Sequence, residues 1–204
     1  MNKYLFTLLM ITPLLSSGQF MKGDKFIGGT FRLSSQTPTK SDQSSTYEVK
    51  GFSIYPTMGF LLNEKFAIGG QIGYSYLNTV YNKNQSSESK YNSERFSLGL
   101  ISRRYFSISD KFIFSINGQV NFDRGTETNT NSTSESKNQN YQIWVSLEPC
   151  FIFFPSPKWG LETSIGSISY SYSRNLSTDL GQNYFNLNYG TINLGLFYYF
   201  RKVN

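Results

Sequence analysis

Six charged residues occur in stretches where polar and apolar residues alternate, and all six lie on the polar side of that alternation. They are Arg32, Arg95, Arg103, Asp123, Glu148 and Glu162. An isolated charge removed from water is far costlier than a matched one, so three cations and three anions in one interior should pair. We predict that Arg95 lies directly opposite Asp123, and that Arg103 is bridged by Glu162, with Glu148 nearby.

Most residues needed for enzymatic chemistry are missing. The 204 residues include no His and one Cys, Cys150. This excludes a zinc site of the Cys/His type, a disulfide framework and a His general base. A Ser or Thr nucleophile would need a Lys or a carboxylate to activate it, and these are sparse and mostly lie in loops. We expect no enzyme activity, no cofactor and no metal, and a buried, unreactive Cys150.

The composition is unusual for a protein that folds in water. Charged residues make up 16% of the chain and aromatic residues 17%, with Ser, Asn and Gly abundant, whereas an average soluble domain has about 25% charged residues. This balance suits a protein whose apolar face meets lipid. The net charge of +6 is modest, and no motif supports nucleic-acid binding.

The first residues have the layout of a secretory signal peptide. Residues 1–3 are basic, residues 4–15 are mostly apolar, and small residues precede a cleavage point after Gly18. An apolar helix of this length rises about 18 Å, which is too short for a hydrocarbon layer of about 30 Å. We therefore predict a cleaved signal peptide over residues 1–18, rather than a membrane anchor, and one domain over residues 19–204.

The dominant pattern in the remaining chain has a period of two residues. In 52–62, 66–76 and 112–122 nearly every second residue is apolar or aromatic, with Ser, Gly, Asn and Gln prominent between them. Successive side chains of a strand point to opposite faces, so each stretch has one apolar and one polar face. A tilted strand crosses a bilayer in about 9–11 residues, which these stretches match.

Eight such strands are predicted, joined by connections that alternate between short and long. The strands are 25–35, 47–62, 66–78, 93–106, 112–123, 141–154, 159–173 and 185–200. Short turns lie at 62–65, 107–111 and 155–158, and long polar loops, expected to be mobile, at 36–46, 78–92, 124–140 and 174–184. The predicted fold is all-β, an eight-stranded antiparallel transmembrane β-barrel with short periplasmic turns and long extracellular loops.

A soluble eight-stranded barrel is the alternative, since pattern alone does not distinguish inside from outside. Two features favour lipid outside. First, the residues that alternate with the apolar ones are mainly Ser, Asn, Gln, Thr and Gly. Second, aromatic residues gather at strand ends, as in the interfacial girdles of membrane barrels. The girdle residues predicted are Tyr74, Tyr76, Tyr105, Phe106, Phe112, Phe151, Trp159, Tyr170, Tyr172, Tyr198 and Phe200.

Three segments, 51–76, 96–120 and 191–200, resemble small outer-membrane proteins of Gram-negative bacteria with an OmpA/OmpX-like eight-stranded barrel domain. The resemblance spans essentially the whole mature chain and implies fold and cell outer-membrane location, but carries over no functional residue. The closing strand also resembles the signal read by the barrel-assembly machinery during biogenesis. It departs from that signal because residues 201–204 follow the final aromatic residue.

These features favour a structural or surface-interaction role without catalysis. Eight strands leave an interior just wide enough to be filled by side chains. A narrow, porin-like pore or a small-ligand transporter is the alternative function. Expected partners are outer-membrane lipid, lipopolysaccharide headgroups near cationic loops, the assembly machinery, and an extracellular partner bound through the long loops.

Overall fold

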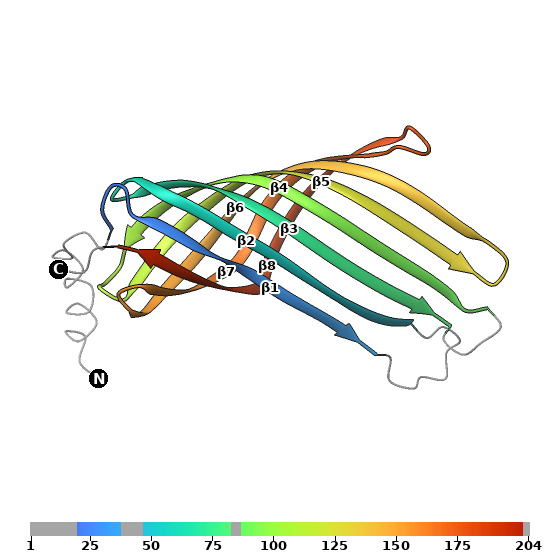
Figure 1. Cartoon of the computed structure of the whole chain (residues 1–204), viewed down its shortest axis with the longest axis horizontal. Helices are drawn as coiled ribbons and strands as arrows, with labels where there is room; N and C mark the ends of the chain where they lie inside the picture. Colours follow the sequence, from blue (N-terminus) through green and yellow to red (C-terminus); the bar gives the residue numbers. More distant parts are fainter. Residues whose placement is uncertain (1–19, 38–46, 83–86, 202–204) are drawn as a thin grey trace, which may run out of the picture.

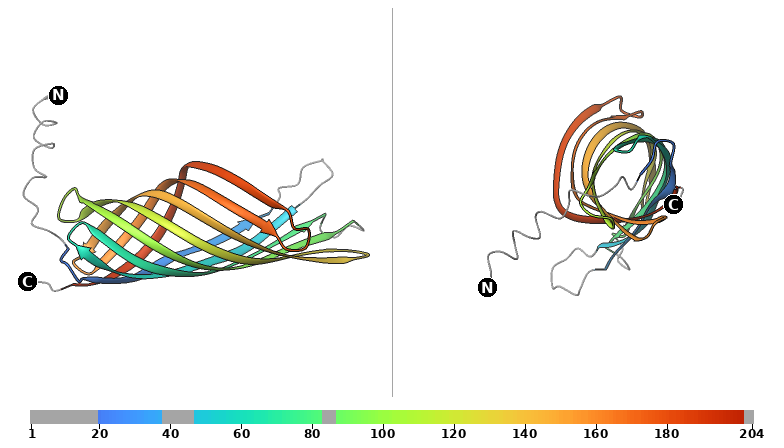
Figure 2. Two further views of the ribbon diagram at one scale, coloured as in Figure 1. Left: turned by 90° about the horizontal axis from the view of Figure 1, so that it is seen from above. Right: turned by 90° about the vertical axis from the view of Figure 1, so that its left-hand side faces the viewer.

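The computed structural model describes residues 20–37, 47–82 and 87–201, in which eight antiparallel strands form a closed barrel in sequence order (Figures 1 and 2). The predicted signal peptide lies outside the described residues. The strands are β1 (Lys25–Gln36), β2 (Tyr47–Asn63), β3 (Phe66–Tyr81), β4 (Ser89–Ser107), β5 (Phe112–Asn131), β6 (Glu135–Ser156), β7 (Trp159–Asn175) and β8 (Gly181–Phe200). The predicted fold class, strand number and strand order are confirmed.

The two ends of the barrel differ. Residues 25–30 of β1 pair with residues 195–200 of β8, which closes the barrel at the end where β1 begins and β8 finishes. The connections after β2, β4 and β6 lie at this end, which we call the turn end. Beyond the paired residues, β8 follows β7 toward the opposite end, the loop end (Figure 2). Among the described residues no helix is long and apolar enough to cross a membrane.

The apolar side chains of the alternating pattern cover the outside of the barrel. Leu100, Val120 and Leu194 face outward and are more than half exposed, with Leu100 71% exposed. Their neighbours of opposite parity, such as Asn121 and Gln119, face the lumen or are buried. A soluble barrel with an apolar interior has the reverse arrangement. The predicted outward direction of the apolar face is therefore confirmed.

Aromatic rings lie in two zones along the outer wall. At the turn end the ring pairs are Phe106–Phe114 (5.8 Å between centroids), Phe112–Phe153 (4.9 Å) and Trp159–Tyr198 (5.1 Å). Toward the loop end they are Phe52–Tyr74 (5.8 Å), Tyr74–Phe96 (4.9 Å) and Phe122–Tyr141 (6.2 Å). We call these the turn-end and loop-end girdles. Tyr105 is a wrong prediction for the girdle, because it is buried inside the barrel.

The predicted loop 124–140 is largely strand. β5 and β6 continue as a hairpin to residues 131 and 135, and Asn131 Oδ1 accepts hydrogen bonds from the backbone of Thr133 and Ser134 at 3.1 and 2.7 Å. Strands were predicted from apolar alternation, and this hairpin shows none because both of its faces are polar. It was therefore predicted to be a loop. Its threonines at every second position favour extended backbone. β4, β7 and β8 also extend into segments that were predicted as loops.

Leu100→Arg should lower the free energy of unfolding in lipid by about 2–4 kcal/mol, the cost of a cation near the bilayer midplane. Leu100 faces outward and lies between Phe96 and Phe106 of the two girdles. Gln71→Arg is the matched control, since Gln71 lies in the adjacent register but lines the polar lumen. Urea unfolding in phospholipid vesicles measures both. Equal costs for the two variants would contradict the inside–outside assignment.

Candidate functional site

The lumen is filled at the turn end by a cluster of apolar and aromatic side chains, which we call the floor. All are 5% exposed or less. The floor consists of Phe20, Phe26, Leu61, Ala67, Ile101, Tyr105, Ile113, Ile152, Phe154, Phe197 and Tyr199. Every strand except β3 and β7 contributes a large side chain, so the floor reaches across the barrel. A packed interior of this kind excludes water and solutes.

Phe20 enters the floor from the segment that precedes β1. Its ring lies 4.7 Å from that of Tyr105 and 5.2 Å from that of Tyr199, between centroids. Backbone hydrogen bonds from Gly23 N to Leu61 O (2.9 Å) and from Leu61 N to the Asp24 carbonyl (2.8 Å) fix the segment to β2. Gly23 has a φ of 89°, which favours glycine. The segment before β1 is therefore part of the closure.

A buried ion pair lies on the lumen side of the floor. Arg103 Nη1 is 2.6 Å from Glu162 Oε2, and the side chains are 6% and 8% exposed. Asn117 Nδ2 donates to the other carboxylate oxygen at 3.0 Å. The Arg103 guanidinium also lies over the Phe197 ring, 4.3 Å from its centroid. The carboxylate is thus held at both oxygens, and the ion pair joins the apolar floor to the polar lumen above.

Cys150 lies in the same layer and is buried. Asn117 Nδ2 also donates to its sulfur, at 3.2 Å. A thiol enclosed in this way has no access for a reacting molecule, which matches a packing role better than a catalytic one. Within the described ranges no three His, Cys, Asp or Glu residues are placed to hold a metal ion.

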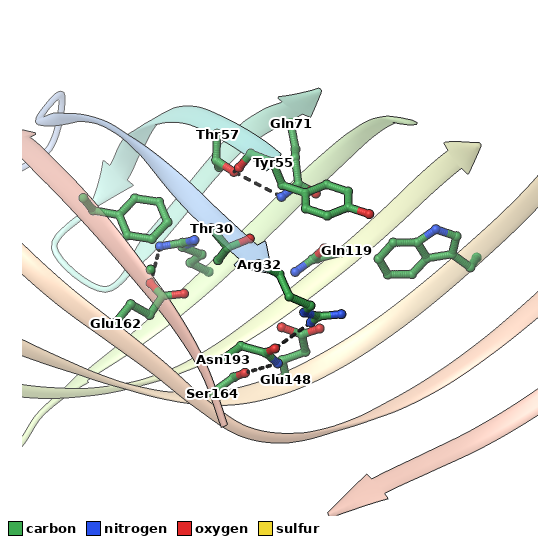
Figure 3. A pocket seen from close by; sticks show the side chains of 14 residues that line it. Thr30, Arg32, Tyr55, Thr57, Gln71, Gln119, Glu148, Glu162, Ser164 and Asn193 are labelled. Carbon is green, nitrogen blue, oxygen red and sulfur yellow. Dashed lines mark hydrogen bonds and ion pairs between the residues drawn. The ribbon is translucent and has the colours of Figure 1, made fainter. Parts of the chain in front are cut away.

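A cavity of about 240 Å³, the lower chamber, lies above the ion pair (Figure 3). Arg32 Nη2 donates to Asn193 Oδ1 at 2.6 Å, and Asn193 Nδ2 donates to Ser164 Oγ at 3.1 Å. Glu148 lines the same cavity and contributes its carboxylate to the wall. Sequence reasoning thus identified the charged residues of this chamber, whereas its amide and hydroxyl partners follow only from the three-dimensional register.

A larger cavity of about 790 Å³, the upper chamber, continues toward the loop end. Both chambers share four lining residues, Arg32, Tyr55, Trp144 and Glu148, which form a waist between them. In the upper chamber Trp144 Nε1 donates to Asp123 Oδ2 at 3.0 Å. The lumen is therefore a polar cavity that is filled by the floor at the turn end and bordered by Tyr55 and Trp144 at the waist.

The predicted direct pairing of Arg95 with Asp123 is wrong. Arg95 lies opposite Gly125, and Asp123 lies opposite Ser97. The five-residue turn after β4 lies one residue later than predicted, at residues 108–112, because Ile108 N and Ser109 N both donate to Phe112 O at 3.0 Å and Ser107 pairs with Ile113.

This one-pair shift makes Arg95 and Asp123 diagonal neighbours on the lumen wall. Arg95 Nη1 instead donates to Gln142 Oε1 at 2.9 Å, and Asp123 accepts from Trp144. Both partners come from β6. Of the six charged residues, the structure joins Arg103 and Glu162 in an ion pair and places the other four around the two chambers.

Sequence reasoning missed the floor. Phe26, Phe197 and Tyr199 occupy lumen parity in their strands, where the other expected residues were small or polar. Large aromatic residues at lumen-facing positions near the turn end could have indicated that side chains fill the lumen there.

The fold is similar to those of solved small outer-membrane barrels. Ail, the attachment invasion locus protein of Yersinia pestis, matches with a TM-score of 0.51 and 16% identity over 88% of this chain and 100% of that chain. OprG from Pseudomonas aeruginosa matches with a TM-score of 0.45 and 11% identity over 91% and 100%. No protein-family model and no curated protein sequence matches the chain. The chain has the fold of the small eight-stranded outer-membrane β-barrels.

Proposed function

We propose that this protein is an integral β-barrel of the outer membrane, sealed against solutes, with a structural or surface-interaction role and no catalytic activity. The observation that carries the proposal is the combination of an apolar outer wall between two aromatic girdles with an interior closed by the floor. Lipid is the solvent that such a wall matches, because an outward apolar band flanked by aromatic girdles is the surface of a transmembrane barrel.

The polar hairpin of β5 and β6 is the feature best placed for contacts outside the cell. It continues beyond Phe122 and Tyr141 of the loop-end girdle to the turn at residues 132–134 (Figure 1). Asn140 Nδ2 donates to Glu127 Oε1 at 2.8 Å, so the hairpin has its own cross-strand contacts. Lipopolysaccharide headgroups and an extracellular partner are the proposed contacts of this surface. The barrel-assembly machinery is the proposed partner during biogenesis.

A pore or small-ligand transporter is the second candidate function, favoured by the continuous polar chambers above the floor. The two candidates differ in conductance. The purified barrel should show no single-channel steps in a planar bilayer, because the packed side chains of the floor fill the lumen at the turn end. Stable steps in the wild-type protein would replace the structural proposal with the pore.

Asn131→Cys should react with a membrane-impermeant maleimide added to intact cells, whereas Ser109→Cys should not. Asn131 ends β5 at the loop end, and Ser109 lies in the turn between β4 and β5. The wild-type protein is the control, because its Cys150 is buried and should remain unlabelled. Labelling of Ser109→Cys alone would invert the orientation. Labelling of neither variant in intact cells, with both labelled after lysis, would refute a surface location.

A further inference from the structure

We propose that the two chambers form a binding site for a small neutral sugar, of one or two rings, which enters from the loop end and does not pass through. The site is bounded by the Arg103–Glu162 ion pair below and by the upper chamber above. Nothing in the proposal depends on membrane location or on conductance, since the site is formed by residues of the lumen and of its loop-end mouth.

The charge of the chambers favours a ligand without net charge. Three cations and three anions line them, so the sum is zero. Each cation already has a partner in the protein. The pairs are Arg103 with Glu162, Arg32 with Asn193, and Arg95 with Gln142. The lining carries no net charge, so a ligand with one net charge would lose its hydration on entry without a net opposite charge to compensate for it.

Two buried oxygen atoms of the upper chamber lack a hydrogen-bond partner among the described residues. They are Asp123 Oδ1 and Ser146 Oγ, whose residues are 5% and 6% exposed. Buried polar atoms are nearly always satisfied, and leaving one unsatisfied costs about 1–3 kcal/mol. Both atoms are covered by protein, so ligand hydroxyl groups would donate to them after the two side chains turn toward the chamber, while neighbouring amides donate to the ligand.

The waist supplies the apolar contact that a sugar ring needs. Tyr55 and Trp144 border both chambers, and the hydrogen bond from Trp144 to Asp123 holds the indole in place. The C–H faces of a sugar are apolar and pack against aromatic rings, while its hydroxyl groups point to the sides. Gln71, Gln119 and Asn193 line the lower chamber, where they offer both donors and acceptors.

The volumes of about 240 and 790 Å³ suit one or two sugar rings rather than a polymer segment. The upper chamber falls in the range of small-molecule sites, roughly 300–1,000 Å³, and the lower chamber adds a smaller recess to it. The floor removes any exit at the turn end, so a bound sugar leaves by the way it enters.

The chain offers a built-in reporter for this site. It has two Trp residues, Trp144 at the waist and Trp159 in the turn-end girdle. In a Trp159→Phe variant of the full chain, refolded in detergent, fluorescence comes from Trp144 alone. The probes are maltose and glucose, with glucuronate and glucosamine as rings of similar size that carry one charge, and dextran as a polymer.

Maltose and glucose should change the Trp144 emission saturably, and glucuronate, glucosamine and dextran should bind at least tenfold more weakly. Asp123→Ala in the same background should weaken maltose binding at least tenfold, measured by calorimetry because the change also alters the indole environment. Asp110→Ala is the matched control, since Asp110 lies in the turn outside the lumen. Circular dichroism verifies folding of each variant.

Three outcomes would overturn the proposal. They are no saturable response to maltose or glucose, charged rings binding as tightly as glucose, and unchanged maltose affinity in folded Asp123→Ala. Bilayer conductance and surface labelling are separate measurements. A failure of sugar binding therefore leaves the proposed outer-membrane role standing, and a failure of that role leaves the sugar site to be judged by its own data.

Discussion

Glu162→Ala should lower the free energy of unfolding by about 3–5 kcal/mol, the usual cost of leaving one partner of a buried ion pair uncompensated. Arg103 is buried against Phe26 and Phe197 and has no second carboxylate in ion-pair contact within the described part of the chain. Asn117 also loses its acceptor on Glu162. Urea titration of the barrel folded in phospholipid vesicles, followed by tryptophan fluorescence, measures the change.

Glu135→Ala is the control, because Glu135 is exposed on the β5–β6 hairpin and should contribute less than about 1 kcal/mol. Glu162→Gln retains the shape and one acceptor oxygen, so its cost should fall between those of the two alanine variants. A loss below about 1 kcal/mol for Glu162→Ala would mean that water reaches Arg103, and that the ion pair is not sealed as the structure indicates.

The same variant separates the roles of charge and packing in closure. If the Arg103–Glu162 ion pair closed the barrel, Glu162→Ala would open a leak. The structure places the aromatic floor on the turn-end side of the ion pair. We therefore expect Glu162→Ala to be less stable and yet electrically silent. Single-channel steps in this variant would show that the ion pair, rather than the floor, closes the barrel.

The strands were predictable because the two faces of a barrel wall meet different surroundings, which makes apolar and polar residues alternate in the sequence. Leu98, Leu100 and Val120 face outward and their neighbours face inward, and this period of two holds along β4 and β5 between the girdles, whereas it shifts by one residue at the bulge between Ser164 and Gly166 of β7. Lumen parity likewise identified Arg103 and Glu162 as interior charges. The strand assignment follows from local alternation alone, and the pairing of the interior charges follows from the cost of burying an unpaired charge.

The remaining features depend on geometry that alternation does not encode. Register across β4 and β5 is set by the hydrogen bonds of the turn at residues 108–112, and an error of one residue in that turn moved the partner of Arg95 from Gly125 to Asp123. The polar hairpin lacks an apolar face because it needs none. The floor includes Phe20 from outside any strand, which no strand pattern could have placed in the lumen.

Phe26→Ala should lower the free energy of unfolding by about 3–5 kcal/mol, as for other buried Phe residues truncated in a packed core. The Phe26 ring is buried between Phe197 and Tyr199, with centroids 6.1 and 5.9 Å away, and under the guanidinium of Arg103. Its removal leaves a cavity that strand backbones cannot collapse to fill. Chemical unfolding in vesicles is again the measurement.

Ile27→Ala is the matched control, because Ile27 follows in the same strand and faces outward. Lipid replaces the lost side chain there, so the cost should be well below that of Phe26→Ala. Equal costs would mean that the two faces of β1 meet the same environment. Conductance adds a second readout, since Phe20, Phe154 and Tyr199 still contact one another across the floor without Phe26. We expect the variant to remain silent, and stable single-channel steps would show that the floor closes the barrel through Phe26 rather than through its full width.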